Sequence, residues 1–127
     1  MNLEKVIFGF FIVFAATLNF GFVLGDIANP DHHFVYELFA AIVVNLIATI
    51  LKFGDRTQVG AVHLATSLVA DLQLIAAAIV WAKATHMSGV APTPQSMAAV
   101  VSLAGGALLA NIVSVVLLIG ETLMLRR

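Results

Sequence analysis

The chain has no cysteine and very little charge. Asp, Glu, Lys and Arg together make up 10% of its 127 residues, whereas they make up about a quarter of a typical soluble domain. Without cysteine, the chain can form neither a disulfide nor a thiolate metal site. The formal net charge of -1 provides no basic surface for a nucleic acid, so we expect no such partner.

Motifs of the common enzyme classes are also missing. The sequence has no pairing of a nucleophile with a base, no phosphate-binding glycine loop and no zincin motif. We therefore expect a protein that is not an enzyme and that has no organic cofactor.

Long apolar segments dominate what remains, since 61% of the residues are hydrophobic. A helix needs about 20 mostly apolar residues to span a bilayer. Four segments meet this requirement, at about 6–24, 34–53, 61–81 and 95–124. The sequence thus predicts an all-α integral membrane protein in which residues 1–127 form a single transmembrane domain of four helices. We expect membrane lipid to surround it, in the inner (plasma) membrane of a bacterium.

The connections between these segments are short, which predicts an antiparallel bundle. Asp31 is the expected N-cap of the second helix, and Gly54 is expected to end that helix in a left-handed conformation. Thr93 and Pro94 suit the N-cap and the first position of the fourth helix.

Positive charge predicts the orientation, because cytoplasmic loops are enriched in Lys and Arg. Only Lys83 falls on one side of the predicted bundle, and the other side carries Lys5, Lys52, Arg56, Arg126 and Arg127. We therefore expect both termini in the cytoplasm, with Tyr36 and Trp81 at the outer interface, where amphipathic rings prefer to lie.

Polar or small residues recur every four positions on two of the segments, so each set shares one helix face. The second segment has Glu37, Ala41, Asn45 and Thr49, and the third has His63, Ser67 and Asp71. Counting from the ends of the segments places Asn45 and Asp71 together near the middle of the membrane. Asn111 is a third candidate at that depth, and Asn19 is a weaker fourth.

Asp71 is the first candidate for a functional residue, because an ionised carboxylate in the middle of a bilayer costs on the order of 3 kcal/mol. Carboxylate, amide and hydroxyl oxygens suit a proton or a hard monovalent or divalent cation. In an alternative interpretation, Asp71 is protonated and joins two helices by donating a hydrogen bond to Asn45.

Two further groups have competing interpretations. His63 could relay protons toward Asp71, or it could simply anchor the helix at the lipid headgroups. Glu37 could attract cations at the outer mouth, or it could only interact with the dipole at the start of its helix. A surface metal site formed by His33 and Glu37, with Asp31 and His32 close in sequence, is a weaker alternative.

The fourth segment has a strip of small residues at a spacing of four, which lets helices approach closely. Its members are Ala98, Ser102, Gly106, Ala110 and Ser114. The strip could pack against a helix of the same chain, or it could form the contact of a homo-oligomer. We favour the oligomer, because a symmetric assembly could arrange several polar stripes around one axis.

These features predict a small homo-oligomeric cation channel, or a transporter coupled to a cation or a proton. Its ion path would follow the second and third helices. The alternative is a structural or accessory subunit of a larger membrane complex, which would use the small-residue strip for docking. The sequence leaves open whether the third helix is broken near Asp71.

Overall fold

The structure, a computed structural model, describes residues 3–25, 29, 33–88 and 92–125. Four helices lie within these residues: α1 (Leu3–Val23), α2 (Val35–Lys52), α3 (Gln58–Ser88) and α4 (Pro94–Leu125). Each is long and apolar enough to cross a membrane, which confirms the four expected spans. α3 runs unbroken past Asp71, so the chain has no re-entrant turn at that position.

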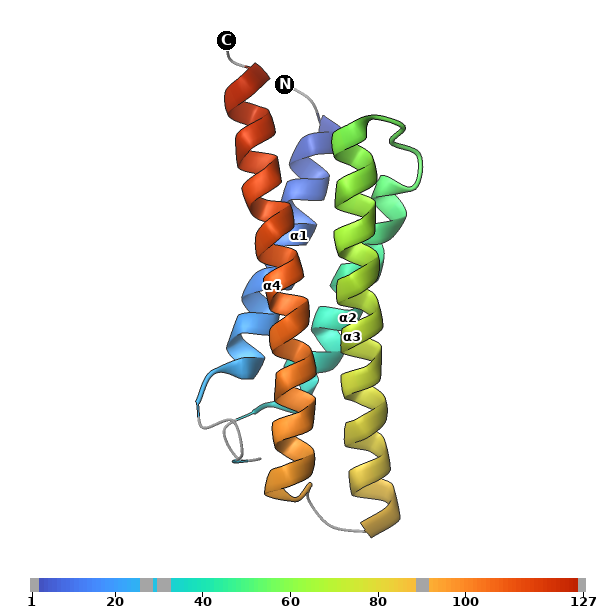
Figure 1. The fold of residues 1–127 in the computed structure, drawn as a ribbon, viewed down its shortest axis with the longest axis vertical. Helices are drawn as coiled ribbons and strands as arrows, with labels where there is room; N and C mark the ends of the chain where they lie inside the picture. Colours follow the sequence, from blue (N-terminus) through green and yellow to red (C-terminus); the bar gives the residue numbers. More distant parts are fainter. Residues whose placement is uncertain (1–2, 26–28, 30–32, 89–91, 126–127) are drawn as a thin grey trace.

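The helices run up and down and form one bundle (Figure 1). α1 packs against α2 and α4, and α3 packs against the same two neighbours. The start of α1, the end of α4 and the turn between α2 and α3 share one end, which we call the hairpin end. The other end, where α1 leads to α2 and α3 leads to α4, is called the loop end.

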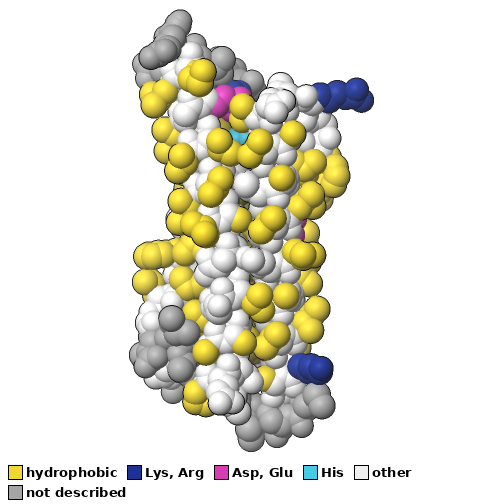
Figure 2. Space-filling view, viewed as in Figure 1, with side chains coloured by type: hydrophobic (Ala, Val, Ile, Leu, Met, Phe, Trp, Pro, Cys, Tyr) yellow, Lys and Arg dark blue, Asp and Glu magenta, His cyan; other side chains and the backbone are white. Residues whose placement is uncertain are grey.

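The outer surface of the bundle is apolar along its length, as the yellow side chains of one face illustrate (Figure 2). Leu72 and Met124 each expose 73% of their surface, and Ile50 exposes 68%. Water would make such a surface prone to association, whereas lipid does not. The surface and the helix lengths together support an integral membrane protein.

Two predictions about helix ends can be compared with the structure: the N-cap of α4 at Thr93 is confirmed, and the left-handed conformation of Gly54 is not. The Oγ1 atom of Thr93 accepts a hydrogen bond from the backbone N–H of Ser96 at 3.1 Å, and α4 begins at Pro94, as predicted. The prediction for Gly54 is wrong, because Gly25 is the described glycine with a positive φ, of 97°. Asp31 lies outside the described residues, and Phe34 occupies the N-cap position of α2 without a side-chain hydrogen bond.

A different residue organises the turn between α2 and α3. The carboxylate of Asp55 accepts hydrogen bonds from the backbone N–H and the hydroxyl of Thr57, at 3.0 and 2.7 Å. The hydroxyl of Thr57 in turn accepts from the backbone N–H of Gly60 at 3.0 Å. Side-chain hydrogen bonds therefore hold this turn, so it does not need a left-handed glycine.

The half of the bundle near the loop end is closed by apolar side chains. Its members come from all four helices and expose at most 2% of their surface: Phe22, Leu38, Leu74, Ala77, Met97 and Val100. We call this set the apolar layer. The other half of the interior holds most of the buried polar side chains, beside a smaller apolar cluster of Phe8, Ile12 and Ala48.

Candidate functional site

Every helix contributes at least one buried polar side chain to the interior of the bundle. These residues are Asn19 from α1, Asn45 and Thr49 from α2, His63, Ser67 and Asp71 from α3, and Asn111 and Ser114 from α4. We call this set the polar column. A single chain encloses it, so neighbouring subunits are not needed to surround these groups.

Asp71 is bound by Thr49. The Oγ1 atom of Thr49 donates to Oδ2 of Asp71 at 2.5 Å, and both side chains are buried. The partner expected from the sequence, Asn45, instead donates its amide to the carbonyl of Ala41 at 3.2 Å. Helical side chains tilt toward the N-terminus of their own helix. In antiparallel helices the two side chains therefore tilt toward each other. This brings together Thr49 and Asp71, which lie one turn apart when depth is counted in residues from the helix ends.

His63 lies nearer the hairpin end and is fully buried. Its Nδ1 atom is 2.6 Å from the hydroxyl of Ser114 on α4. The ring of Phe8 from α1 meets the His63 ring edge-on, with the two centroids 5.0 Å apart. His63 is therefore enclosed by the bundle, which differs from a histidine that only anchors a helix among headgroups.

The contacts between α3 and α4 fix the order of the polar column. His63 meets Ser114, and Gln73 lies against the backbone of Gly106. In this antiparallel register, Asn111 lies at about the level of Ser67, between His63 and Asp71. Successive members on α3 are four residues apart, which is slightly more than one helical turn and corresponds to about 6 Å along the helix. On α3 the polar column therefore runs from His63 to Asp71, and two of its other members, Asn45 and Asn19, lie beyond Asp71 toward the apolar layer.

Several atoms of the polar column have no hydrogen-bond partner within the described part of the protein. They are both amide atoms of Asn19 and of Asn111, Oδ1 of Asn45, Nε2 of His63, Oγ of Ser67 and Oδ1 of Asp71. Buried polar atoms are nearly always satisfied by protein, water or an ion. A row of such atoms is the chemistry expected of a wet or ion-binding interior.

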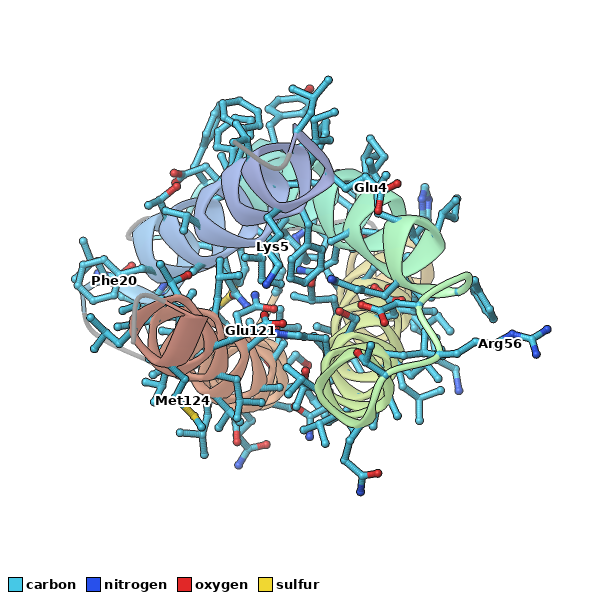
Figure 3. The ribbon with its side chains drawn as sticks, turned by 90° about the horizontal axis from the view of Figure 1, so that it is seen from above. Glu4, Lys5, Phe20, Arg56, Glu121 and Met124 are labelled. Atoms are coloured by element: carbon cyan, nitrogen blue, oxygen red, sulfur yellow. The ribbon has the colours of Figure 1, made fainter. Side chains whose placement is uncertain are left out.

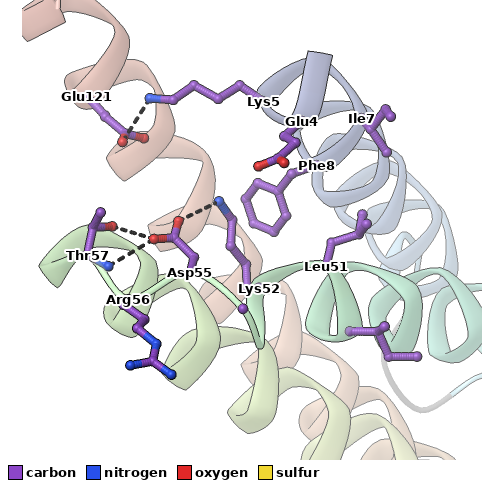
Figure 4. A pocket seen from close by; sticks show the side chains of 12 residues that line it. Glu4, Lys5, Ile7, Phe8, Leu51, Lys52, Asp55, Arg56, Thr57 and Glu121 are labelled. Atoms are coloured by element: carbon purple, nitrogen blue, oxygen red, sulfur yellow. Dashed lines mark hydrogen bonds and ion pairs between the residues drawn. The ribbon is translucent and has the colours of Figure 1, made fainter. Parts of the chain in front are cut away.

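A cavity of about 840 Å³ opens at the hairpin end, and we call it the vestibule. Lys5 and Glu121 point into the bundle there and form an ion pair of 2.8 Å, while Arg56 points away (Figure 3). Lys52 lies 3.3 Å from a carboxylate oxygen of Asp55 and 4.2 Å from the centroid of the Phe8 ring (Figure 4). Phe8 thus lies between the charged groups of the vestibule and His63.

Asp55 makes this end of the molecule sensitive to acid. Its hydrogen bonds with Thr57, together with Lys52, lower the pKa of the Asp55 carboxyl from 3.8 to about 2. A carboxyl whose pKa is lowered on folding stabilises the folded state above its unfolded pKa and loses that effect as the pH falls through the folded value. We expect the wild-type melting temperature in detergent to fall more steeply between about pH 4 and pH 2 than that of Asp55→Asn. Parallel curves for the two proteins would contradict this prediction.

The candidate groups at the loop end are separate from the polar column. The carboxylate of Glu37 lies against the backbone of Gly21 on α1, so it packs within the chain. His33 is buried, and its Nδ1 atom is 2.5 Å from the carbonyl oxygen of Phe22, to which it donates. Asp31 and His32 lie outside the described residues. Among the residues that are described, no three His, Asp or Glu side chains are close enough together to hold a metal.

The small-residue strip of α4 packs partly within the chain. Ser114 contacts His63, and Gly106 gives room to the Gln73 amide, both on α3. Ser102 is exposed, while Ala98 and Ala110 are half-buried. The face of α4 that is fully buried instead follows the heptad-like series Met97, Val100, Ala104, Ala107, Asn111 and Ser114.

Two members of the site were not assigned to it from the sequence. Phe8 is one of many phenylalanines on the first segment, and its contacts with Lys52 and His63 set it apart. Ser114 was assigned to helix packing alone. Ser114 lies three residues after Asn111, and residues three apart share a helix face, so this spacing could have placed Ser114 beside Asn111 in the interior.

Comparison with known proteins places the chain in a family. No curated protein and no solved structure matches it. One family model, described as a family of unknown function (DUF6394), matches residues 32–122. The matched part includes all members of the polar column except Asn19, and it covers well over half of the sequence. The chain therefore belongs to the DUF6394 family.

Proposed function

We propose that this protein moves a cation or a proton across the membrane, as a small channel or as a transporter coupled to that ion. Asp71 is its central binding group. The observation that carries the proposal is the polar column: a buried carboxyl that has one unpartnered oxygen and lies in a row of unpartnered polar atoms. Buried charges in membrane helices are expensive, and they commonly mark ion pathways.

Buried polar side chains follow α3 from Asp71 toward the vestibule, whereas the apolar layer closes the interior toward the loop end, which favours a transporter over a permanently open channel. Polar groups continue from Asp71 toward the vestibule, while the apolar layer begins at Leu74, one turn away in the other direction. Such an interior gives access from one end only. Transport then requires a second conformation in which the apolar layer opens.

The distribution of positive charge supports an orientation for this transport. Lys5, Lys52 and Arg56 are all at the hairpin end, and Lys83 is on α3 near the loop end. Under the positive-inside rule, the hairpin end with its vestibule faces the cytoplasm of a bacterial inner membrane. We propose a homo-oligomer in which each subunit has its own path, with the exposed part of the α4 strip near Ser102 as a contact.

Flux measurements on purified protein in liposomes test the proposal. Gradients of H⁺, Na⁺, K⁺, Mg²⁺ and Ca²⁺ are applied one at a time, with protein-free liposomes as the baseline. We expect flux of at least one of these ions clearly above the baseline. Flux at the baseline for all five would contradict the proposal and favour the accessory subunit, which should then co-purify with an unrelated membrane protein.

A further inference from the structure

We propose that the transported or coupling ion is the proton, that Asp71 and Thr49 form its switch, and that His63 passes protons between the vestibule and that switch. This inference rests on the proposed function and names its ion.

The hydrogen bonds of Thr49 provide the first step. Its Oγ1 atom lies 2.5 Å from Oδ2 of Asp71 and 2.9 Å from the backbone carbonyl oxygen of Asn45. A hydroxyl has a single proton, so it donates to only one of these oxygens at a time. If Thr49 donates its proton to the Asn45 carbonyl, it has no proton left for Asp71. The short contact between Thr49 and Asp71 is then a hydrogen bond only if Asp71 is protonated and is the donor.

The pair therefore has a satisfied arrangement for each protonation state of Asp71. With Asp71 ionised, Thr49 donates to the carboxylate. With Asp71 protonated, Asp71 donates to Thr49, and Thr49 turns its proton to the Asn45 carbonyl. The change needs only the rotation of the hydroxyl and of the carboxyl group, so this site can accept and release a proton without moving a helix.

His63 provides the second step, because it is the titratable group of the polar column nearest the vestibule. Its Nε2 atom is buried and unpartnered, while Nδ1 contacts Ser114. Ser67, also unpartnered, lies on the same helix face midway to Asp71. The turn of about 6 Å on each side of Ser67 is short enough for a bridging water.

The proton balance along this route is simple. A proton from the vestibule binds Nε2 of His63, and the neutral imidazole becomes a cation. The imidazolium then gives up a proton through Ser67 and water to Oδ1 of Asp71, and rotation of the carboxyl brings this protonated oxygen to Thr49. The imidazole returns to neutral and the carboxylate becomes a neutral acid.

The surroundings of His63 suit a proton better than a metal cation. Charged groups act on His63 from every neighbouring element: Lys5 on α1, Lys52 on α2, Asp55 in the turn and Glu121 on α4. Two of these groups are positive and two are negative, so their formal charges sum to zero. The Phe8 ring and the Lys52 ammonium lie over the route to His63. A metal ion would need several oxygen ligands along this route, whereas a proton needs one hydrogen bond at a time.

The experiment measures proton uptake with a pH dye trapped in liposomes, beside the metal-ion fluxes. His63→Gln keeps hydrogen-bonding groups but cannot carry a proton, and Thr49→Val keeps the shape of the side chain without its hydroxyl. We expect each to lower proton flux about tenfold or more, in line with the loss of a proton-transfer group. Thr49→Ser keeps the hydroxyl and should recover most of the flux that Thr49→Val loses. The matched control for His63→Gln is His86→Gln, which changes an exposed histidine of the same helix and should retain wild-type flux.

Infrared difference spectra between acid and neutral pH separate the switch from a purely structural role of Thr49. The carboxylic acid band of Asp71 should appear at acid pH, vanish in Asp71→Asn and shift in Thr49→Val but not in Thr49→Ser. Wild-type proton flux in His63→Gln or Thr49→Val would overturn the inference. Metal-ion flux without proton movement would overturn it and leave the proposed function standing, whereas no flux of any ion would overturn the proposed function itself.

Discussion

Asp71→Asn is expected to reduce ion flux in liposomes to the level of protein-free membranes while the protein remains folded. Asparagine has nearly the same shape as aspartate, and its carbonyl oxygen can still accept the hydrogen bond that Thr49 donates at 2.5 Å. It can neither carry a negative charge nor take up a proton. The variant therefore removes the proposed chemistry and keeps the packing between α2 and α3.

Stability and a second carboxyl provide the controls for this variant. We expect the melting temperature of Asp71→Asn to equal or exceed that of the wild type, because a neutral amide costs less to bury than a carboxylate. Asp55→Asn changes a carboxyl of the turn outside the membrane spans and should keep most of the flux. Wild-type flux in Asp71→Asn would remove Asp71 from the ion path and reduce it to a link between two helices.

Leu74→Ser is expected to produce a leak. Leu74 is fully buried, belongs to the apolar layer and lies three residues beyond Asp71. Serine removes most of the side-chain volume and adds a hydroxyl that can hold water. Water could then extend from the polar column into the apolar layer, and we expect passive ion leakage to rise by about tenfold or more, since lowering a barrier by about 1.4 kcal/mol is enough for that factor.

The neighbouring exposed leucine provides a matched control. Leu72 exposes 73% of its surface to the surroundings of the bundle, so Leu72→Ser makes the same chemical change outside the interior. It should leave the leak unchanged. Truncating a buried leucine to alanine costs about 2–5 kcal/mol, so the melting temperature of Leu74→Ser should fall. A folded Leu74→Ser protein with no added leak would show that the apolar layer is not the barrier.

Hydropathy alone was enough to predict the four helices, because each span has to bury its backbone in lipid and so needs a long apolar segment. The polar side chains that turn inward were also predicted for the most part. Asn45, Thr49, His63, Ser67, Asp71 and Asn111 follow helical spacing, and an apolar surface forces such residues into the interior. Local signals also predicted the N-cap at Thr93, which depends on neighbours in sequence.

Two of the errors concern contacts between helices, and one concerns the side chains of the turn between α2 and α3. Thr49 rather than Asn45 binds Asp71, because the tilt of the side chains and the packing of α2 against α3 decide which side chain lies within hydrogen-bond distance of the carboxyl. Gly54 was expected to have a left-handed conformation, but Asp55 and Thr57 hold the turn with their side chains. The position of Phe8 between Lys52 and His63 joins three helices, and no pattern within one helix could reveal it.

The unequal lengths of the helices connect the protein to the thickness of its membrane. α2 has 18 residues and α4 has 32, which correspond to about 27 Å and about 48 Å at a rise of about 1.5 Å per residue. The hydrocarbon core of a bilayer measures about 30 Å, so one bilayer cannot match both helices. Lipid must thin beside α2, or α4 must tilt or project beyond the headgroups. Thicker lipid would draw Lys52, at the end of α2, below the headgroups, so acyl-chain length acts directly on the mouth of the vestibule.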